Sequence, residues 1–462
     1  MSEPTSDTAD TRTEELRRRI ADLMPGVRAD LEELVRIPSV SLDSFDPVEV
    51  TRSAERVVEL LTDAGASAEI VQVEGGHPAV IGHIDGPQGA PTVLLYAHHD
   101  VQPPGDESDW RSSPFEPTER DGRLYGRGAA DDKAGVMAHV AALRAHDGRP
   151  PVSVRLFVEG EEEVGSESLP ALLEAHADRL DCDAIVIADS ANWAVGTPSL
   201  TATLRGQVRA VVETRALDHG LHSGIFGGPV PDAITAMCRL LATLHTDAGD
   251  VAVDGLVHGA DPGVDYPEES LRADSGILDG VDLVGTGSLA SRLWSKPSLT
   301  VIGIDAPAVD VAANLLTPSC RAKLSLRIAP EQDPLAAYEA LRRHLERHAP
   351  WGVQVSVELV DEGAGFTAST EGPVARTMLG ALADAWQAEP NAVGLGASIP
   401  FISQFAEAFP KAAILITGVE DPDTRAHGAD ESLHLAEFEK ACLAEALLLD
   451  RLGRQDDAYA TP

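Results

Sequence analysis

The chain has 462 residues, and its 75 acidic residues against 36 basic ones give a formal net charge of −39. This charge argues against nucleic acid as a partner, because phosphates would be repelled, and it disfavours an anionic membrane surface. No segment approaches the roughly 18 uninterrupted apolar residues of a membrane helix, and the length favours two domains.

Two features of the sequence favour a cytoplasmic location. The first 13 residues are polar and acidic and do not resemble a secretory signal, so we expect a frayed tail there. The cysteines are dispersed and lack a C-x-x-C spacing, which favours free thiols in a reducing compartment over disulfides or a sulfur-ligated metal. They are Cys182, Cys238, Cys320 and Cys442.

The first part of the chain alternates helical and strand patterns. Apolar residues at helical spacing predict a helix over 13–37, which Pro25 and Gly26 could kink or divide. The elements predicted next are a helix over 53–64, strands over 69–73, 79–84 and 92–96, a helix over 133–144, a strand over 152–158, a helix over 169–176 and a strand over 183–188. This alternation indicates an α/β domain with a largely parallel sheet.

The pattern changes near Leu200. The predicted elements are strands over 208–214, 322–328 and 353–359 and helices over 232–245 and 334–347, while 247–297 is rich in Gly, Asp and Ser and has weak periodicity. The end resembles the first part, with a helix over 373–388, a strand over 412–417 and a helix over 435–452. The middle block could therefore be an inserted α/β domain.

Potential metal ligands follow the predicted strands, which is where sites form in open α/β sheets. His98 and Asp100 come directly after the strand over 92–96. Residues two apart in extended backbone point the same way, so Asp100 can orient the His98 imidazole while His99 points elsewhere. Taken alone, the segment could also be a polar strand end.

A second segment, 126–133, reads G-R-G-A-A-D-D-K and opens a predicted helix. It matches neither of the common phosphate-binding patterns, and its paired acids would repel phosphate. The glycines allow a tight backbone, and Asp131 is placed to bridge two cations. Asp132 could equally be a helix cap.

Three glutamates, Glu161 to Glu163, follow the strand over 152–158. Such a run is usually a solvated surface, but here it lies between a buried-looking strand and a glycine turn, where a cation would relieve the repulsion. Adjacent side chains diverge, so that one can bind metal while its neighbour acts as a general base.

Asp189 ends the apolar run 184–188, where an aspartate can be a ligand or a turn former. His427 follows the last predicted strand and, by itself, would more often be structural. Together the segments supply two histidines and several carboxylates, a set suited to zinc, manganese or cobalt.

The sequence resembles the M20 metallopeptidase family, in particular its dipeptidase branch, which includes the cytosolic non-specific and carnosine dipeptidases. The matching segments occur in family order and span most of the chain. They are A-H-H-D-V-Q-P at 97–103, L-Y-G-R-G-A-A-D-D-K at 124–133, E-G-E-E-E-V-G-S at 159–166, I-A-D-S at 187–190, H-S-G-I-F-G-G at 222–228, G-A-S-I-P at 396–400 and A-H-G-A-D-E at 426–431.

The resemblance implies two divalent metal ions per subunit. The expected ligands are His98 and Asp189 for one ion, Glu163 and His427 for the other, and Asp131 as the bridge between them. It further implies that Asp100 orients His98, that Glu162 is the general base acting on a water between the ions, and that the Asp131–Asp132 peptide is cis. If the register of the glutamate run were shifted by one residue, Glu161 would be the base.

The family architecture implies a two-metal catalytic domain with a mainly parallel sheet, formed by 1–200 and 391–462. A ferredoxin-like α/β dimerisation domain would be inserted at 201–390. In a homodimer, His222 would reach the other subunit's site and stabilise the oxyanion, although by itself it could be a surface-loop residue.

The same resemblance suggests substrate contacts from the inserted domain and the segment after it. Arg327 would bind a substrate carboxylate, which suits a guanidinium fork, although it could instead form a structural salt bridge. Asn314, Gly396 and Ser398 are further candidates.

The resulting hypothesis is a cytoplasmic enzyme that hydrolyses dipeptides with a free C-terminal carboxylate, without nucleic-acid or membrane partners. One alternative is an N-acyl amino-acid deacylase with the same chemistry. A protein that binds metal without turnover is an alternative of another class, which the presence of Glu162 disfavours, because binding alone does not require a base.

Overall fold

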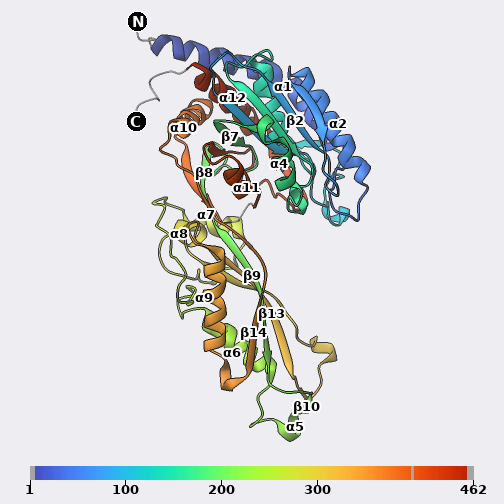
Figure 1. The fold of residues 1–462 in the computed structure, drawn as a ribbon, viewed down its shortest axis with the longest axis vertical. Coiled ribbons are helices and arrows are strands. Elements are labelled where there is room, and N and C mark those ends of the chain that lie inside the picture. Colours follow the sequence, from blue (N-terminus) through green and yellow to red (C-terminus); the bar gives the residue numbers. More distant parts are fainter. Residues whose placement is uncertain (1–5, 397–399, 455–462) are drawn as a thin grey trace. The chain divides into compact units, whose positions relative to one another are not determined.

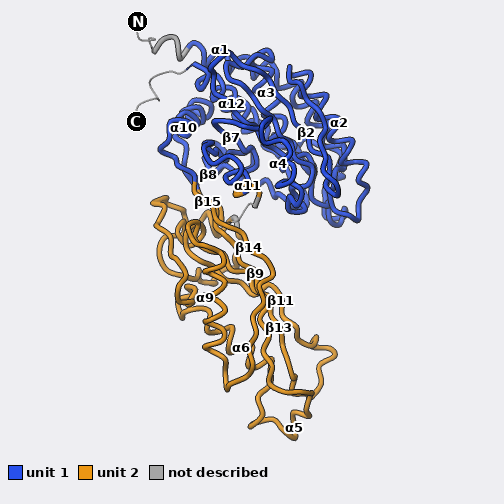
Figure 2. Tube along the Cα trace, viewed as in Figure 1, with its two compact units in different colours: residues 1–202, 368–393, 404–462 blue, residues 203–367, 394–403 orange. Residues whose placement is uncertain are grey.

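The computed structural model describes residues 6–396 and 400–454 (Figure 1). They form two compact units (Figure 2). Unit 1 comprises 1–202, 368–393 and 404–462, and unit 2 comprises 203–367 and 394–403. The second boundary differs from the predicted one, because the helix over 373–386 belongs to unit 1 and not to the insert.

Unit 1 contains, wholly or in part, α1 Ser6–Val35, α2 Pro47–Asp63, β1 Ser67–Val71, β2 Ala79–Ile84, β3 Thr92–His98, β4 Thr118–Arg120, β5 Arg123–Tyr125, α3 Lys133–Ala145, β6 Ser153–Glu159, α4 Leu169–Leu180, β7 Ala184–Ile187, β8 Ser199–Leu204, α10 Pro373–Trp386, β16 Asn391–Leu395, α11 Pro400–Ala408, β17 Ala413–Ile416, β18 Ser432–His434 and α12 Leu435–Arg454. Most predicted elements of this part are present, with ends shifted by a few residues.

The N-terminal helix corrects two expectations. Residues 6–13, expected to be a frayed tail, are helical, and α1 continues through Pro25 without being divided. Leu16 and Ile20 before the proline, and Leu31 and Leu34 after it, are all buried in the same apolar cluster. Packing of one continuous apolar face therefore outweighs the hydrogen bond that the proline removes.

The central sheet of unit 1 has the order β1-β2-β6-β3-β7-β17-β8-β15, with β16 paired to β8. Its middle strands β6, β3, β7 and β17 are parallel, as predicted. Val93 and Leu95 face a core formed with α1, α3 and α12. Tyr96 faces the other side, where its ring lies 5.1 Å from that of Phe405 in α11. Both faces are thus covered, and the carboxyl ends of the parallel strands share one edge.

Unit 2 contains β9 Gly206–Arg215, β10 Leu221–His222, α5 Ser223–Phe226, α6 Ala233–Leu241, α7 Glu268–Ser275, α8 Leu289–Trp294, β11 Ser298–Ile304, β12 Leu315–Leu316, β13 Ser319–Ile328, α9 Pro334–Arg347, β14 Gln354–Gly363 and β15 Phe366–Thr367. Its main sheet is antiparallel, with the order β11-β13-β9-β14. Alternate residues of β9 and β13, such as Val208, Val212 and Leu324, are buried against α6 and α9.

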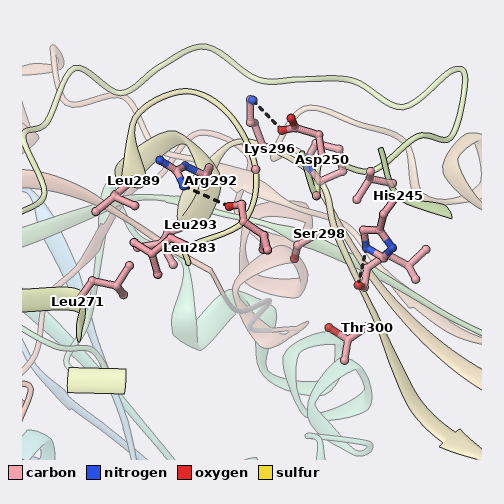
Figure 3. Close-up of a pocket in the computed structure, with 16 residues that line it drawn as sticks. His245, Asp250, Leu271, Leu283, Leu289, Arg292, Leu293, Lys296, Ser298 and Thr300 are labelled. Carbon is pink, nitrogen blue, oxygen red and sulfur yellow. Dashed lines mark hydrogen bonds and ion pairs between the residues drawn. The ribbon is translucent and has the colours of Figure 1, made fainter. Parts of the chain in front are cut away.

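A cavity of about 600 Å³ lies in unit 2 beside the segment that lacked a clear sequence pattern. Figure 3 shows leucine side chains, among them Leu271 and Leu289, on one side of it. On another side Lys296 Nζ lies 3.1 Å from Asp250 Oδ1. The charged groups at this cavity therefore have protein partners.

All four cysteines carry free thiols. Among the residues that the structure describes, no helix combines the length and the apolar character needed to cross a membrane.

Candidate metal centre

Three neighbouring parallel strands of unit 1 end at the candidate metal centre. His98 is the last residue of β3, the glutamate run follows β6, and Asp189 comes two residues after β7. Since the carboxyl ends of parallel strands meet at one edge, side chains separated by more than 90 positions along the chain come together there. The sequence analysis expected potential ligands where predicted strands end, and the structure places His98, the glutamate run and Asp189 there.

The donor atoms form two groups that share one aspartate. His98, Asp131 and Asp189 make up the first group, and Asp131, Glu163 and His427 the second. Within each group one donor atom per residue lies within 4.8 Å of the others. Asp131 Oδ1 lies 3.1 Å from His98 Nε2, and Asp131 Oδ2 lies 3.0 Å from His427 Nε2. The two oxygens of Asp131 therefore face different histidines.

Asp100 connects His98 to the glutamate run. Its Oδ1 lies 3.4 Å from His98 Nδ1 and accepts a hydrogen bond from the Glu162 backbone N–H at 3.2 Å. Its Oδ2 accepts from the Glu163 N–H at 3.1 Å and from Ser41 Oγ at 2.7 Å. One buried carboxylate thus fixes both a potential ligand, His98, and the backbone of Glu162 and Glu163. His99 points away, as expected, with its Nε2 2.9 Å from Pro78 O.

The three consecutive glutamates have different surroundings. Glu161 is committed to the backbone, because its carboxylate accepts from the N–H groups of His77 at 2.9 Å and Ser168 at 2.5 Å. The carboxylate of Glu163 accepts from the N–H and the side-chain amide of Gln102 at 3.1 and 2.9 Å and lies 3.3 Å from His427 Nε2. Burial raises the pKa of Glu162 well above its ordinary value.

The glycine segment before α3 forms the tight turn that its sequence suggested. Gly128 has a φ of +78°, and a Cβ there would lie 2.5 Å from a Val101 methyl, so that only glycine fits. The Asp131–Asp132 peptide is cis, as the resemblance implied. Asp132 caps α3 by accepting from the Gly135 N–H at 3.2 Å, which was the alternative role considered for it.

The electrostatics of the centre reflect an excess of carboxylates. Burial raises the pKa of Asp189 to about 7. Burial opposes ionisation of Asp131 too, but hydrogen bonds from His427 and His98 hold its pKa below the ordinary value. In turn, Asp131 and Glu163 raise the pKa of His427 to about 11. The mutual repulsion of the Asp131, Glu163 and Asp189 carboxylates would be relieved by added positive charge.

This donor set fits a pair of divalent metal ions. Imidazole nitrogens and carboxylate oxygens are ligands of zinc, manganese and cobalt, and Asp131 can offer one oxygen to each of two ions. Glutamine and carboxylate partners hold the donors in place, which is typical of built metal sites.

The predicted substrate contacts lie in unit 2. His222 and Asn314 are exposed and adjacent, with the Ser223 N–H donating to Asn314 O at 3.0 Å. Arg327 is half-buried on β13, where it pairs with Gln207 near the start of β9. Gly396 O accepts from Arg205 Nε at 3.1 Å. Ser398 lies outside the described residues.

Three residues around the centre were not predicted. Ser41 and Gln102 donate to Asp100 and Glu163, and Glu431 is a buried acceptor for the glycine segment. Gln102 and Glu431 belong to the quoted segments A-H-H-D-V-Q-P and A-H-G-A-D-E, so their type and position were available as a signal. Ser41 offered none.

Comparison with known proteins gives the class of the molecule. The model of "Peptidase family M20/M25/M40" matches residues 94–451. A cysteinylglycine-S-conjugate dipeptidase from Corynebacterium striatum is 36% identical over 372 residues, which cover 79% of this chain and 82% of that protein. The crystal structure of human carnosine dipeptidase 1 has a TM-score of 0.78 and 25% identity, covering 96% of this chain and 99% of that one.

A third comparison concerns the metal. The YXEP protein of Bacillus subtilis, described as a dinuclear metal binding peptidase of the M20 family, has a TM-score of 0.61 at 14% identity and shows the same fold. The matched region covers 93% of this chain and 98% of the YXEP chain. The fold and the paired donor groups define a metal-dependent hydrolase. More specifically, the chain belongs to peptidase family M20/M25/M40.

Proposed function

We propose that this enzyme hydrolyses dipeptides that have a free C-terminal carboxylate, using two divalent metal ions. The observation that carries the proposal is the position of Asp131, whose two carboxylate oxygens face the two histidines of adjacent donor groups. The proposed ligands are His98 and Asp189 for one ion and Glu163 and His427 for the other, with Asp131 shared. The names of the relatives from C. striatum and human, both dipeptidases, support the substrate class.

In this proposal Glu162 moves the proton. When bound, two divalent ions would polarise the scissile carbonyl. They would also lower the pKa of a water molecule, which could then lose a proton and attack the carbonyl carbon. Glu162 takes the proton from the attacking water while the new C–O bond forms, and it returns that proton to the amine nitrogen as the C–N bond breaks. Its raised pKa suits both steps, because the group must accept and then release a proton.

The choice of Glu162 over Glu161 is supported by hydrogen bonding. Glu161 accepts from two backbone N–H groups, so its carboxylate already has a structural role. The backbone N–H of Glu162 is held by Asp100, which also lies next to His98. This arrangement orients the Glu162 segment relative to the proposed ligand.

Recognition of the substrate is assigned to unit 2. Arg327 would bind the substrate carboxylate through its guanidinium fork. Gly396 and Ser398, in the sequence that follows β16, are further proposed contacts. Burial and the nearby charge of Arg209 lower the pKa of Arg327. A bound anion such as a substrate carboxylate would stabilise this partly desolvated cation.

The geometry of unit 2 supports a homodimer. Arg327 lies level with Gln207 on β9, whereas β10, which contains His222, lies beyond the other end of that strand (Figure 1). Asn314 adjoins β10, because its carbonyl accepts from the Ser223 N–H. The separation is roughly 26 Å of strand, from eight residues at about 3.3 Å each. One dipeptide cannot touch both ends of the same unit 2. His222 of the partner subunit would therefore supply the oxyanion contact, and Asn314 of the partner subunit would accompany it.

We further propose zinc or manganese as the native metal, with cobalt as a substitute, and a cytoplasmic location. The mixed imidazole and carboxylate ligands support these metals, and the free thiols support a reducing compartment.

The test is hydrolysis of matched dipeptides with free or amidated C-termini, after chelation and after manganese or zinc is restored. We expect metal-restored cleavage of the free-carboxylate forms alone. Cleavage of N-acyl amino acids instead would identify a deacylase. Metal binding without turnover of either class would identify a non-catalytic binding protein and overturn the proposal.

A further inference from the structure

A buried ion pair joins the two loops that carry Asp131 and His427. Arg127 lies four residues before Asp131, and Glu431 lies four residues after His427. Their side chains are 1% and 0% exposed, and the guanidinium Nη1 of Arg127 donates a hydrogen bond to Glu431 Oε2 at 2.5 Å. Two loops that are 300 positions apart in the sequence are thereby held at a fixed separation.

The contacts of this pair are reciprocal. Glu431, from the His427 loop, accepts backbone N–H groups of the Asp131 loop from Gly128 at 3.0 Å, Ala130 at 3.0 Å and Asp131 at 3.2 Å. Arg127 belongs to the Asp131 loop, and its Nη2 donates a hydrogen bond to the carbonyl oxygen of Gly428, the residue after His427, at 3.2 Å. Each loop therefore supplies a side chain that binds backbone adjoining the proposed ligand of the other.

We infer that Arg127 and Glu431 are positioning residues that set the distance between Asp131 and His427. They thereby determine metal binding by the donor group that contains His427, which we call the second metal position. This inference rests on the proposed assignment of Asp131 and His427 as ligands. A hydrogen bond to the Asp131 N–H fixes the backbone from which the shared carboxylate extends. Restraint of Gly428 fixes the backbone next to His427, whose side chain is 58% exposed.

A glutamine cannot replace Glu431 in this arrangement. The carboxylate offers acceptors on both oxygens, one facing Ala130 and Asp131 and the other facing Gly128 and Arg127. An amide would retain one acceptor and turn its NH₂ group toward two donors. The Asp131 loop would then shift even though the side-chain volume is unchanged.

The experiment is a titration of metal-free protein with Co²⁺, followed by its visible absorption. Wild type is expected to bind two equivalents. In E431Q the second equivalent should bind about 10- to 100-fold more weakly, which is the usual cost of removing a residue that orients metal ligands. R127M should show the same selective loss.

A matched control separates positioning from general stability. Glu437 is 2% exposed, lies six residues further on, and accepts from Trp386 Nε1 at 2.6 Å and Lys440 Nζ at 2.7 Å. The Gly196 N–H also donates to Glu437 at 2.9 Å. Because none of these three partners belongs to the Asp131 loop or the His427 loop, E437Q should destabilise the fold yet bind both equivalents as wild type does.

The double variant R127M/E431M keeps the inference testable if the single variants do not fold. Replacing both partners removes the uncompensated buried charge, so thermal stability should recover relative to R127M, while weak binding of the second Co²⁺ should persist. Wild-type affinity for both equivalents in a folded E431Q or in the double variant would overturn the inference. Failure of wild type itself to bind two equivalents would instead overturn the proposed metal centre.

Discussion

The two units hold their functional candidates in different ways. In unit 1, His98 and Glu163 lie at or just after strand ends, where Asp100 and Gln102 hold them, and Ser41 in turn donates to Asp100. In unit 2, His222 and Asn314 are exposed at one end of a sheet and Arg327 is half-buried at the other. In the proposed function, the chemistry would therefore be organised within unit 1, whereas recognition would draw on residues of unit 2.

This contrast predicts that changes around the candidate ligands of unit 1 alter metal binding or the chemical step, while a change at Arg327 of unit 2 alters substrate binding. Three variants below test that division and a fourth tests stability away from the centre, from the largest expected effect to the smallest.

The largest effect is expected for E162Q. Loss of the general base should reduce kcat by about 10²- to 10⁴-fold, with metal content unchanged. Steady-state kinetics and elemental analysis of the same sample measure both quantities. E161Q is the matched control, because the Glu161 carboxylate binds backbone N–H groups, and it should retain most of its turnover. A reversed ranking of the two variants would make Glu161 the base.

Asn in place of Asp100 should weaken metal binding about 10- to 100-fold. The new amide would lose an acceptor for the Glu162 or Glu163 N–H and would no longer attract the His98 ring. Competition with a chelator measures the affinity. S41A, which removes a single hydroxyl and leaves the carboxylate intact, should have a smaller effect. Equal effects would show that Asp100 acts as a general structural residue.

For unit 2, R327M should lower kcat/KM for free-carboxylate dipeptides by about 10- to 100-fold, since a hydrogen bond to a charged group contributes about 1.5–3 kcal/mol. Metal content should stay at the wild-type level. Arg321 is on the same strand but exposed, and it pairs with Asp305 at 2.8 Å, so R321M should behave as wild type. Loss of metal from R327M would break the proposed division between the units.

The smallest effect on catalysis is expected for E445Q, which tests stability away from the centre. Burial lowers the pKa of His139, but the charge and hydrogen bond of Glu445 raise it more, so the net pKa lies above the ordinary value. A raised folded-state pKa stabilises the fold below about pH 6.5 and loses that effect as pH rises through the folded value.

Denaturant unfolding of wild type and E445Q at pH 6 and pH 9 measures this difference. E445Q should cost on the order of 1–3 kcal/mol at pH 6 and less at pH 9. A cost that increases toward pH 9 would show that the His139 charge does not contribute as described.

The sequence predicted the parts of unit 1 whose signals are local. The strands before His98, Glu161 and Asp189 are short apolar runs, and parallel pairing of β6, β3 and β7 then brings their carboxyl ends together. The separate roles of Glu161, Glu162 and Glu163 were harder to predict, because three identical residues in a turn leave their register open. The hydrogen bonds that distinguish Glu161 from Glu162 come from residues far away in sequence, such as His77 and Asp100.

Two other features were beyond sequence reasoning. The A-H-G-A-D-E segment marks Glu431 as a residue, but its role depends on backbone N–H groups about 300 positions earlier, and no local pattern reports such a contact. Strand β11, Ser298–Ile304, was not predicted, because it is an edge strand whose residues from Thr300 onward are exposed, so that burial imposes no alternation on them. Long-range contacts and weakly buried elements both leave little trace in a single sequence.

The place of β17 in the sheet has a consequence for biosynthesis. This strand, Ala413–Ile416, lies between β7 and β8, although it is made more than 200 residues after them. A nascent chain on the ribosome therefore carries β7 as an open apolar edge while the whole of β9 to α9 is being translated. We expect unit 2 to fold during synthesis and the sheet of unit 1 to close only after release of the last helix, with the unfinished edge as a substrate for chaperones until then.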